Sequence, residues 1–418
     1  MVSIKIFISL IFYLAQDLNA QEQADIIKYD GRSSTRIVQT YRFDELPDNG
    51  SYTIEINNIS GNVNVVGHEG SGAKITITNI TFGITKEEVK KAHKFSRTIV
   101  NNLEDQEIIQ ILGEHKKSNN IYIENLIEIE MPKNVNLKFD LLGGDIDVNG
   151  IEGESILETL GGDIRIEDHR GRMDTKTNGG DIDIKMLDGV LRGHSFGGNI
   201  KISRSKGDLS SSSIGGNINM EDLSGKIESQ TSGGSINLLD VTGTEISCHA
   251  SGGSIECNNI SGQINIKNSG QGINIKNANG NLEVQSNGGS IMIDGSNGPL
   301  KCEASIGDIK MLNVAGRVES LNSNGNIFLE LLYDSSIDDL GIHLETHSGD
   351  ITIDIPKGLP GNINSTIHQS SSVKDLNSEM PLNVSIFQDK VMGTRKIKDG
   401  TIPINLEVHS GIITIKER

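Results

Sequence analysis

Glycine recurs at a fixed interval along the middle of this 418-residue chain. From Gly144 onward, an anchor glycine returns every 18 residues, with a single step of 19 and with Gln271 standing in once between two glycines. A fixed period of this kind predicts one supersecondary unit stacked many times on itself. The anchors stand at positions 144, 162, 180, 198, 216, 234, 253, 271, 289, 307 and 325, and a second glycine follows each of the first ten after nine residues, at 153, 171, 189, 207, 225, 243, 262, 280, 298 and 316.

Apolar and polar residues alternate after each anchor, as the two-residue period of a β-strand requires. The second half of each unit repeats the alternation more weakly and closes on small residues such as Thr177 and Ser213. The pattern predicts an all-β fold, a single-stranded β-solenoid of about eleven coils with glycines at the corners. The pairs predicted to face inward in the first six coils are Ile146 and Val148, Ile164 and Ile166, Ile182 and Ile184, Ile200 and Ile202, Ile218 and Met220, and Ile236 and Leu238.

The composition fits a solenoid better than a conventional globular domain. Only 35% of the residues are apolar, 4% are aromatic and Trp is absent, which leaves little material for one large core. A solenoid needs less, because each coil encloses a narrow file of side chains and hydrogen-bonds to the next. The net charge of −18, without a basic cluster, disfavours nucleic acid as a partner.

The start of the chain resembles an export signal. Residues 1–20 contain Lys5 followed by the apolar run "IFISLIFYLA", and Leu18 and Ala20 suit cleavage before Gln21. An apolar run of about ten residues is too short to span a bilayer as a helix, which takes about 20. We therefore expect a mature chain without a transmembrane span, located outside the cytoplasm, in the periplasm or at the cell surface.

The flanking regions follow the period less closely, and we interpret them as caps that protect the open ends of the solenoid. Residues 21–142 are predicted to form a β-rich N-terminal cap with one helical insert near 85–103, where Thr85 and Glu88 resemble a capping box. The solenoid is assigned to residues 143–330. Residues 331–418 lose the 18-residue step but keep the alternation, which predicts a C-terminal β cap.

Asp145, Asp163 and Asp181 share one position of the coil and are the candidate metal ligands. Short Asp, Asn and Ser side chains at turns ordinarily bond to nearby backbone amides. Stacked carboxylates could instead bind calcium through oxygen ligands. The nonapeptide calcium roll, however, has glycine where these coils have isoleucine, so turn chemistry is the preferred interpretation and no metal is assigned.

Asp147, Arg165, Asp183 and Lys201 form an outward row of alternating charge. Such a row could form a catalytic cleft, as in polysaccharide-cleaving β-helices, but cross-strand ion pairs are the simpler interpretation. We assign no catalytic residue and no cofactor. His169, His194 and His249 lack metal-ligand spacing and are expected to be ordinary coil residues.

Three cysteines are unusual for an exported chain, because one must stay unpaired. Cys257 takes an inward isoleucine position, and Cys302 takes an inward position in the second half of its unit. These positions predict buried, small apolar residues. A bridge between Cys248 and Cys257 is the alternative.

Three stretches resemble the bacterial family named "putative adhesin", a domain of unknown function made of short β-strand repeats and related to the auto-transporter adhesin head GIN domain. They are "IEIEMPKNVNLKFDLLGGDIDVNGIEGESILETLGGDIRIEDHRG" at 127–171, "HSGDITIDIPKG" at 347–358 and "VHSGIITIKER" at 408–418, while "GGNINM" and "GQGINIKN" echo the GIN signature. The resemblance implies an exported, non-catalytic β-solenoid of the cell envelope, adhesin-like, with an unidentified glycan or protein as its partner.

Two alternatives stay open at this point. One is a carbohydrate-active β-helix enzyme. The other, implied by the relatives alone, is an accessory protein of envelope-stress signalling.

Overall fold

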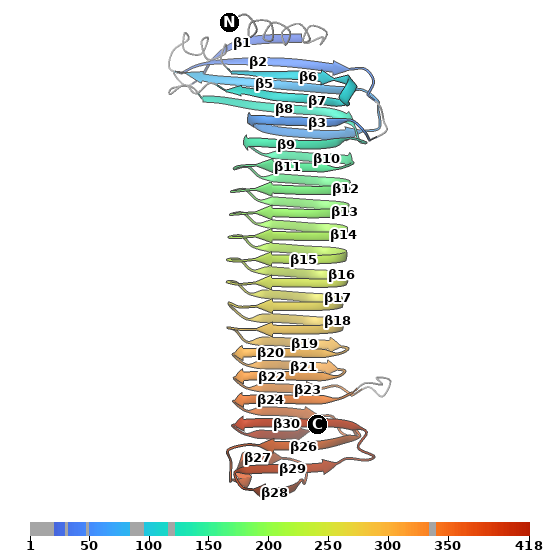
Figure 1. The fold of residues 1–418 in the computed structure, drawn as a ribbon, viewed down its shortest axis with the longest axis vertical. Helices are drawn as coiled ribbons and strands as arrows, with labels where there is room; N and C mark the ends of the chain where they lie inside the picture. The colour runs from blue at the N-terminus through green and yellow to red at the C-terminus, as the bar shows by residue number, and fades with distance from the viewer. Residues whose placement is uncertain (1–20, 30–31, 47–49, 84–95, 116–121, 334–339) are drawn as a thin grey trace, which may run out of the picture. The chain divides into compact units, whose positions relative to one another are not determined.

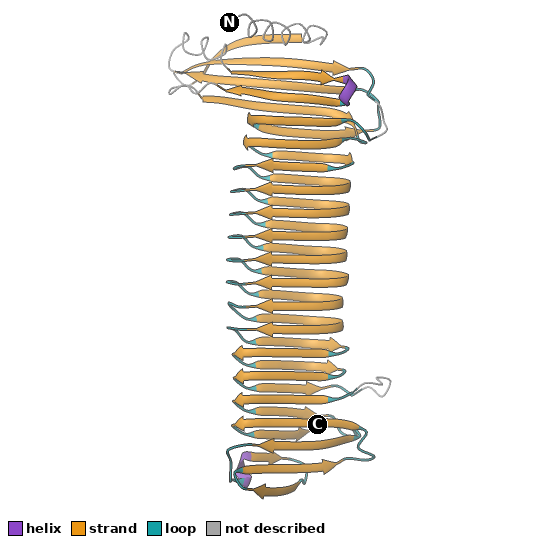
Figure 2. Cartoon of the chain, in the orientation of Figure 1, coloured by secondary structure: helices purple, strands orange, loops and turns teal. Residues whose placement is uncertain are grey.

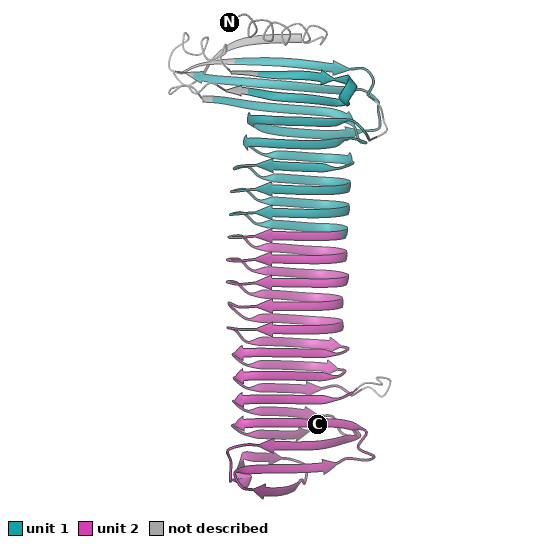
Figure 3. Cartoon of the chain, viewed as in Figure 1, with its two compact units in different colours: residues 1–207 teal, residues 208–418 magenta. Residues whose placement is uncertain are grey.

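A computed structural model describes residues 21–29, 32–46, 50–83, 96–115, 122–333 and 340–418 of the chain. The predicted export signal lies outside these residues. The chain divides into two compact units, Met1–Gly207 and Asp208–Arg418 (Figure 3). The division falls inside the repeat region, and the boundaries proposed from the sequence stay a prediction.

Strands dominate both units, which confirms the all-β prediction (Figure 2). The strands of unit 1 are β1 (Gln21–Tyr29), β2 (Arg32–Phe43), β3 (Thr53–Ser60), β4 (Asn62–His68), β5 (Ala73–Gly83), β6 (Ser96–Leu103), β7 (Ile108–His115), β8 (Tyr122–Pro132), β9 (Asn136–Gly143), β10 (Ile146–Glu152), β11 (Ser155–Thr159), β12 (Ile164–Thr177) and β13 (Ile182–Ser195). A 3-10 helix, η1 (Glu104–Gln106), separates β6 from β7, and β14 (Ile200–Ser213) contains the division between the units.

The strands of unit 2 continue the series, and most of them are labelled in Figure 1. They are β15 (Ile218–Thr231), β16 (Ile236–Ala250), β17 (Ile255–Asn268), β18 (Ile273–Ser286), β19 (Ile291–Asn297), β20 (Leu300–Ile306), β21 (Ile309–Ala315), β22 (Val318–Asn324), β23 (Ile327–Leu331), β24 (Ile342–Ser348), β25 (Ile351–Ile355), β26 (Gly361–Ile367), β27 (Leu376–Ser378), β28 (Asn383–Phe387), β29 (Lys390–Lys396), β30 (Ile402–Ser410) and β31 (Ile413–Glu417). A second 3-10 helix, η2 (Val373–Asp375), precedes β27.

Successive coils are parallel and in register at the predicted step. In unit 1, Ile146 pairs with Ile164, which pairs with Ile182. All three side chains are completely buried, so the isoleucines form a continuous inner file. The single step of 19 also has a structural basis: Gly225 pairs with Gly243 but Lys226 pairs with Glu245, so one extra residue bulges from β16.

The isoleucine file of unit 2 continues after the 18-residue step is lost. Ile327 pairs with Ile351, and Ile351 pairs with Ile413. The step from Ile351 to Ile413 is long because β26 to β29 are inserted between β25 and β30. Of these strands, β26 pairs in parallel with β30 and β27 with β31, while β29 is antiparallel to both β26 and β28.

Both corners of a coil satisfy their own backbone groups. At one corner, the Thr177 hydroxyl donates to the carbonyl of Gly162 at 2.8 Å and accepts from the amide of Gly180 at 3.1 Å; Ser195 makes the same pair of bonds with Gly180 and Gly198. The opposite corner of unit 2 holds Asn and Asp in the left-handed backbone region that these residues tolerate. There the side-chain amide of each Asn bonds to the side-chain oxygen of the coil before, as in Asn259 to Asp240, Asn277 to Asn259 and Asn313 to Asp294.

The N-terminal strands of unit 1 extend the two halves of the coil. One half of the coil pairs through β10 with β4, and β4 continues to β8, β5 and β2. The other half pairs through β11 with β9, and β9 continues to β3, β7 and β6. Strand β4 enters the coil register because its Asn-Val-Asn-Val repeat has the same alternation as the coil, with Val63 opposite Ile146.

The helix predicted near 85–103 is wrong over the residues that the structure describes. Ser96–Leu103 forms strand β6, antiparallel to β7, and residues 84–95 lie outside the described part of the chain. Thr98 and Val100 are buried and Ile99 is half-buried between them, which is strand periodicity. Consecutive β-branched side chains pack well on a pleated surface and lose rotamer freedom in a helix, so the strand is favoured.

All three cysteines are free and buried. Cys257 takes the inward position opposite Leu238 and Ile275, as predicted. Cys248 lies in the other half of its coil, where it accepts a hydrogen bond from Ser229 at 3.2 Å. Burial raises the pKa of the Cys248 thiol to about 12, so this thiol stays protonated at neutral pH.

The isoleucine file should respond very differently from the outward row beside it. Replacing Ile182 by Asp places an unpaired charge in a fully buried position and should lower the free energy of unfolding by several kcal/mol. Replacing Asp183 by Asn on the half-exposed face should change it by less than about 1 kcal/mol. Thermal melting of the two variants measures the difference, and equal shifts would refute the 18-residue register.

His169 gives unit 1 an acid-sensitive position. The side chain is completely buried between Ile151 and Leu187, and burial lowers its pKa from 6.5 to about 4, although Asp168 opposes the shift. Between these two values the unfolded chain binds a proton that the folded chain does not, so stability falls as the pH drops from 6.5 towards 4. At about 1.4 kcal/mol per pH unit, the loss approaches about 2.5 kcal/mol at pH 4.5.

The variant His169→Leu should remove this contribution, because leucine already fills the same position in the next coil. Urea unfolding of wild type and variant between pH 7.5 and pH 4.5 provides the measurement. The two proteins differ only at residue 169, so parallel curves would contradict the assignment.

Candidate binding surface

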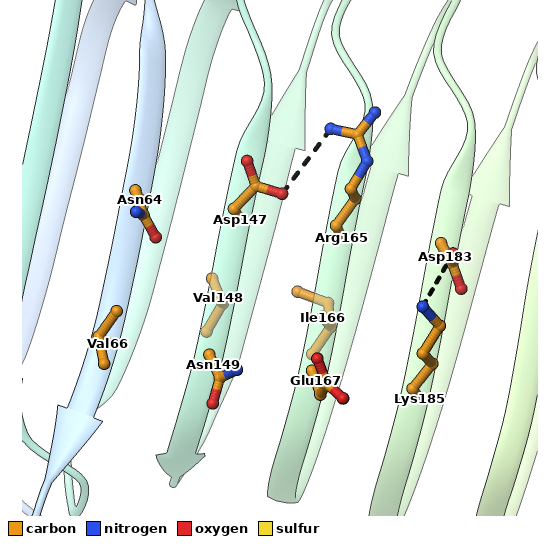
Figure 4. Close-up of a pocket in the computed structure, with 10 residues that line it drawn as sticks. All are labelled: Asn64, Val66, Asp147, Val148, Asn149, Arg165, Ile166, Glu167, Asp183 and Lys185. Carbon is orange, nitrogen blue, oxygen red and sulfur yellow. Dashed lines mark ion pairs between the residues drawn. The ribbon is translucent and has the colours of Figure 1, made fainter.

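The outward face of unit 1 carries a shallow groove of about 300 Å³ on strands β4, β10, β12 and β13 (Figure 4). Three of the four residues of the predicted charged row lie in it, and the exposed Lys201 on β14 is not among its lining residues. The groove is lined by Asn64, Val66, Asp147, Val148, Asn149, Arg165, Ile166, Glu167, Asp183 and Lys185.

Strand register brings these side chains together. Asp147 pairs with Arg165, and Arg165 pairs with Asp183 one coil further on. Asn64 of β4 pairs with Asp147 from the other side. Neighbouring strands lie about 4.8 Å apart, so equivalent side chains form a continuous row along the face of the unit.

The charges in this row are paired with one another. Arg165 Nη1 lies 3.4 Å from Asp145 Oδ2 and 3.7 Å from Asp147 Oδ1, and its other terminal nitrogen bonds to Asp163. Partial burial opposes the charge of Arg165, but the three carboxylates raise the pKa of its guanidinium. Lys185 Nζ lies 3.6 Å from Asp183 Oδ2. These side chains are about one-third to one-half exposed, so each pair contributes at most about 1 kcal/mol.

The candidate metal ligands accept hydrogen bonds from the backbone of the next coil. Oδ1 of Asp145 accepts the backbone amide of Asp163 at 2.9 Å, and Oδ1 of Asp163 accepts that of Asp181 at 2.9 Å. Asp181 accepts the amide of Asn199 in the same way. These carboxylate oxygens therefore face N–H donors of the next coil, and the neighbouring positive charge comes from Arg165.

Unit 2 repeats this bond with other residue types. The amide of Ser235 donates to Asn217, and that of Ser254 donates to Ser235. Near the end of the chain, the amide of Asn326 donates to Asp308, that of Asp350 to Asn326, and that of Ile412 to Asp350. Any short side chain with an acceptor oxygen serves here, which explains why Asp, Asn and Ser interchange along the ladder.

The three histidines considered from the sequence lie on different strands, β12, β13 and β16. His169 is buried at a corner, with Nε2 at 2.9 Å from the Ser155 hydroxyl. The half-buried His194 meets Phe196 edge-on, with ring centroids 4.7 Å apart. His249 is half-buried on β16 in unit 2.

Sequence reasoning missed part of the groove. Lys185 and Glu167 lie on its outward face two residues beyond the predicted row, and period-2 alternation would have found them. Asn64 and Val66 lie on β4, more than 80 residues before Asp147 in the chain. The signal was the stretch "GNVNVVG" at 61–67, which reproduces the glycine and alternation of a coil outside the assigned repeats.

Comparisons with known proteins give one distant likeness. No protein-family model matches the chain, and no curated protein matches it. Among solved structures, the chain is similar to the crystal structure of a "putative cell adhesion protein" from Clostridium sporogenes, with 10% identity and a TM-score of 0.16 over 96% of this chain and 100% of that one. In the described part of the chain, no helix has the length and apolar character needed to cross a membrane.

Proposed function

We propose that this chain is an exported, non-catalytic β-solenoid protein of the bacterial cell envelope that binds a glycan or protein through the outward faces of its coils. The observation that carries the proposal is the filled interior. Ile164, Ile182 and Leu191 in unit 1, and Ile236 and Ile264 in unit 2, are each at most 1% exposed. With apolar side chains filling the coils, recognition falls to the outer surface.

The outer surface suits extended, repetitive ligands. Parallel in-register coils place one side-chain type after another at the spacing of neighbouring strands, as in the 2.8 Å bond between the side chains of Asn219 and Asn237. A polymer lying along such a face would make many weak contacts, which multiply into useful avidity. The resemblance of residues 127–171 to adhesin-type repeats and the N-terminal stretch typical of an export signal support the same proposal.

The groove supports one competing function, cleavage of an acidic polysaccharide. It gathers Asp147, Asp183 and Glu167 beside Arg165, which are residue types that such an enzyme uses. Against catalysis, the carboxylates of Asp147 and Asp183 already form ion pairs with Arg165 and Lys185. The paired arrangement fits cross-strand stabilisation.

A glycan array combined with turnover assays on acidic polysaccharides separates binding from catalysis. Single substitutions at Asp147, Arg165, Asp183 or Lys201 should leave the chain folded and should weaken ligand binding gradually, because many contacts share the binding energy. Polysaccharide cleavage by wild type that one of these changes abolishes would refute the binding function.

A deletion series tests whether the coils act as repeated, interchangeable units. Removing residues 181–198 joins Gly180 to Asn199 and takes out one complete coil, so the shortened chain should fold and keep most of its binding. Removing only residues 181–189 takes out half a coil and should prevent stacking.

Fractionation of cells expressing the tagged wild type tests export, and retention in the cytoplasm would contradict it.

A further inference from the structure

Three strands of unit 2 that are distant in sequence carry histidines onto one outward face. Strand β30 lies between β24 and β26 and is parallel to both. The register pairs Glu345 with Glu407, and it pairs Ile367 with Val408. His347 and His409 therefore fall at equivalent positions of β24 and β30, and His368 follows the end of β26 at the matching position.

The three imidazoles stack on one another. The rings of His347 and His409 have centroids 4.4 Å apart and are inclined by 8°, and those of His368 and His409 are 4.6 Å apart and inclined by 12°. His409 thus lies at the centre of the stack. Its neighbours come from segments more than 40 residues away along the chain in one case and more than 60 in the other.

Two carboxylates face this stack. Glu407 Oε1 lies 2.6 Å from His368 Nε2, and Glu345 Oε1 lies 3.5 Å from His409 Nε2. The side chains of His368, Glu407 and His409 are 18%, 36% and 35% exposed. Glu345 and His347 also line a groove of about 300 Å³ on this face, so solutes can reach the cluster.

We propose that this cluster binds one divalent transition-metal ion of the zinc class, with His368, Glu407 and His409 as ligands. One ligand atom from each of the three residues lies within 4.8 Å of the other two, and the same holds for Glu345, His347 and His409. Two imidazoles with one carboxylate form a common ligand set for zinc. Both triads use His409, so the expected stoichiometry is one ion per chain.

The less exposed triad is the better site. The short contact between His368 and Glu407 already holds two of its ligands in place. Bonds of about 2.0–2.1 Å to a tetrahedral ion place the ligand atoms about 3.4 Å from one another. The nearly parallel rings of His368 and His409 must turn out of their stack for both nitrogens to face the ion. Glu345, beside His409, is within reach as a fourth ligand.

Such an ion would link β30 to the residue that follows β26, and Glu345 as a fourth ligand would add β24. The segment from β26 to β29 is inserted between β25 and β30, and its strand β26 pairs in parallel with β30. An ion bound by both His368 and His409 would fasten this inserted segment to β30. The inference is independent of the proposed surface binding, because the ligands lie outside the groove of unit 1.

Titration of Zn²⁺ into the full, untagged chain tests the proposal, with isothermal calorimetry for affinity and elemental analysis for stoichiometry. Wild type should bind one equivalent, and thermal melting should shift upward with Zn²⁺ concentration. His409→Gln should weaken binding by more than about 100-fold, because even the loss of an outer-shell partner costs about 10- to 100-fold. His368→Gln should have a similar effect and guards against a fold defect specific to the first variant.

His249→Gln is the matched control, since this residue is a half-buried histidine of the same unit outside the cluster. It should bind Zn²⁺ like wild type. The proposal fails if wild type takes up no Zn²⁺, or if His409→Gln, folded by circular dichroism, binds it as tightly as wild type. Uptake of Ca²⁺ in preference to Zn²⁺ would also overturn it, because calcium selects oxygen ligands.

Discussion

Close contact between the backbones of successive coils at their corners is the constraint on which the fold depends. A Cβ added to Gly162 would lie 1.9 Å from the carbonyl oxygen of Gly144, and one added to Gly180 would lie 2.0 Å from that of Gly162. No side chain fits at these distances, so the anchor glycines are required by space. The glycines that follow each anchor after nine residues are confined by the backbone of the neighbouring coil in the same way. Gly171 also has a φ of +122°, which disfavours other residues.

Backbone groups brought so close together must be hydrogen-bonded. Inside the corner, the hydroxyls of Thr177 and Ser195 bridge the glycines of neighbouring coils. Outside it, the carboxylates of Asp145 and Asp163 accept a hydrogen bond from the backbone amide of the next coil. A buried amide or carbonyl left without a partner would cost about 1–3 kcal/mol. The polar residues of the repeat are therefore part of the stacking, and the outward rows between the corners are left to vary.

Local rules predicted the coil but not what interrupts it. Strict spacing fixed the register of Ile146, Ile164 and Ile182, because one slipped residue would turn every apolar side chain outward. The segment containing Ser96–Leu103 has both a helical and a strand pattern, and its pairing with β7 decided the outcome. The groove was half predicted for the same reason: Asp147 and Arg165 follow the period, whereas Asn64 joins them through long-range pairing.

Only part of the histidine cluster could have been found from the sequence. The segments "LETHSGDITIDI" and "LEVHSGIITIKE" are nearly alike, and aligning them as one repeat places Glu345 and His347 beside Glu407 and His409. His368 gives no such signal, because it follows a strand of the inserted segment whose position depends on its pairing with β30.

Residue-resolved amide hydrogen exchange tests the corner ladder most directly. The amides of Asp163 and Asp181 lie in glycine-rich corners, yet each donates to the aspartate one coil before it. The account predicts that both amides exchange slowly. In the variant Asp163→Ala, exchange at the amide of Asp181 should accelerate, while the backbone amide of residue 163 keeps its bond to Asp145 and stays protected. Fast exchange of both amides in the wild-type chain, beside protected strand amides, would contradict it.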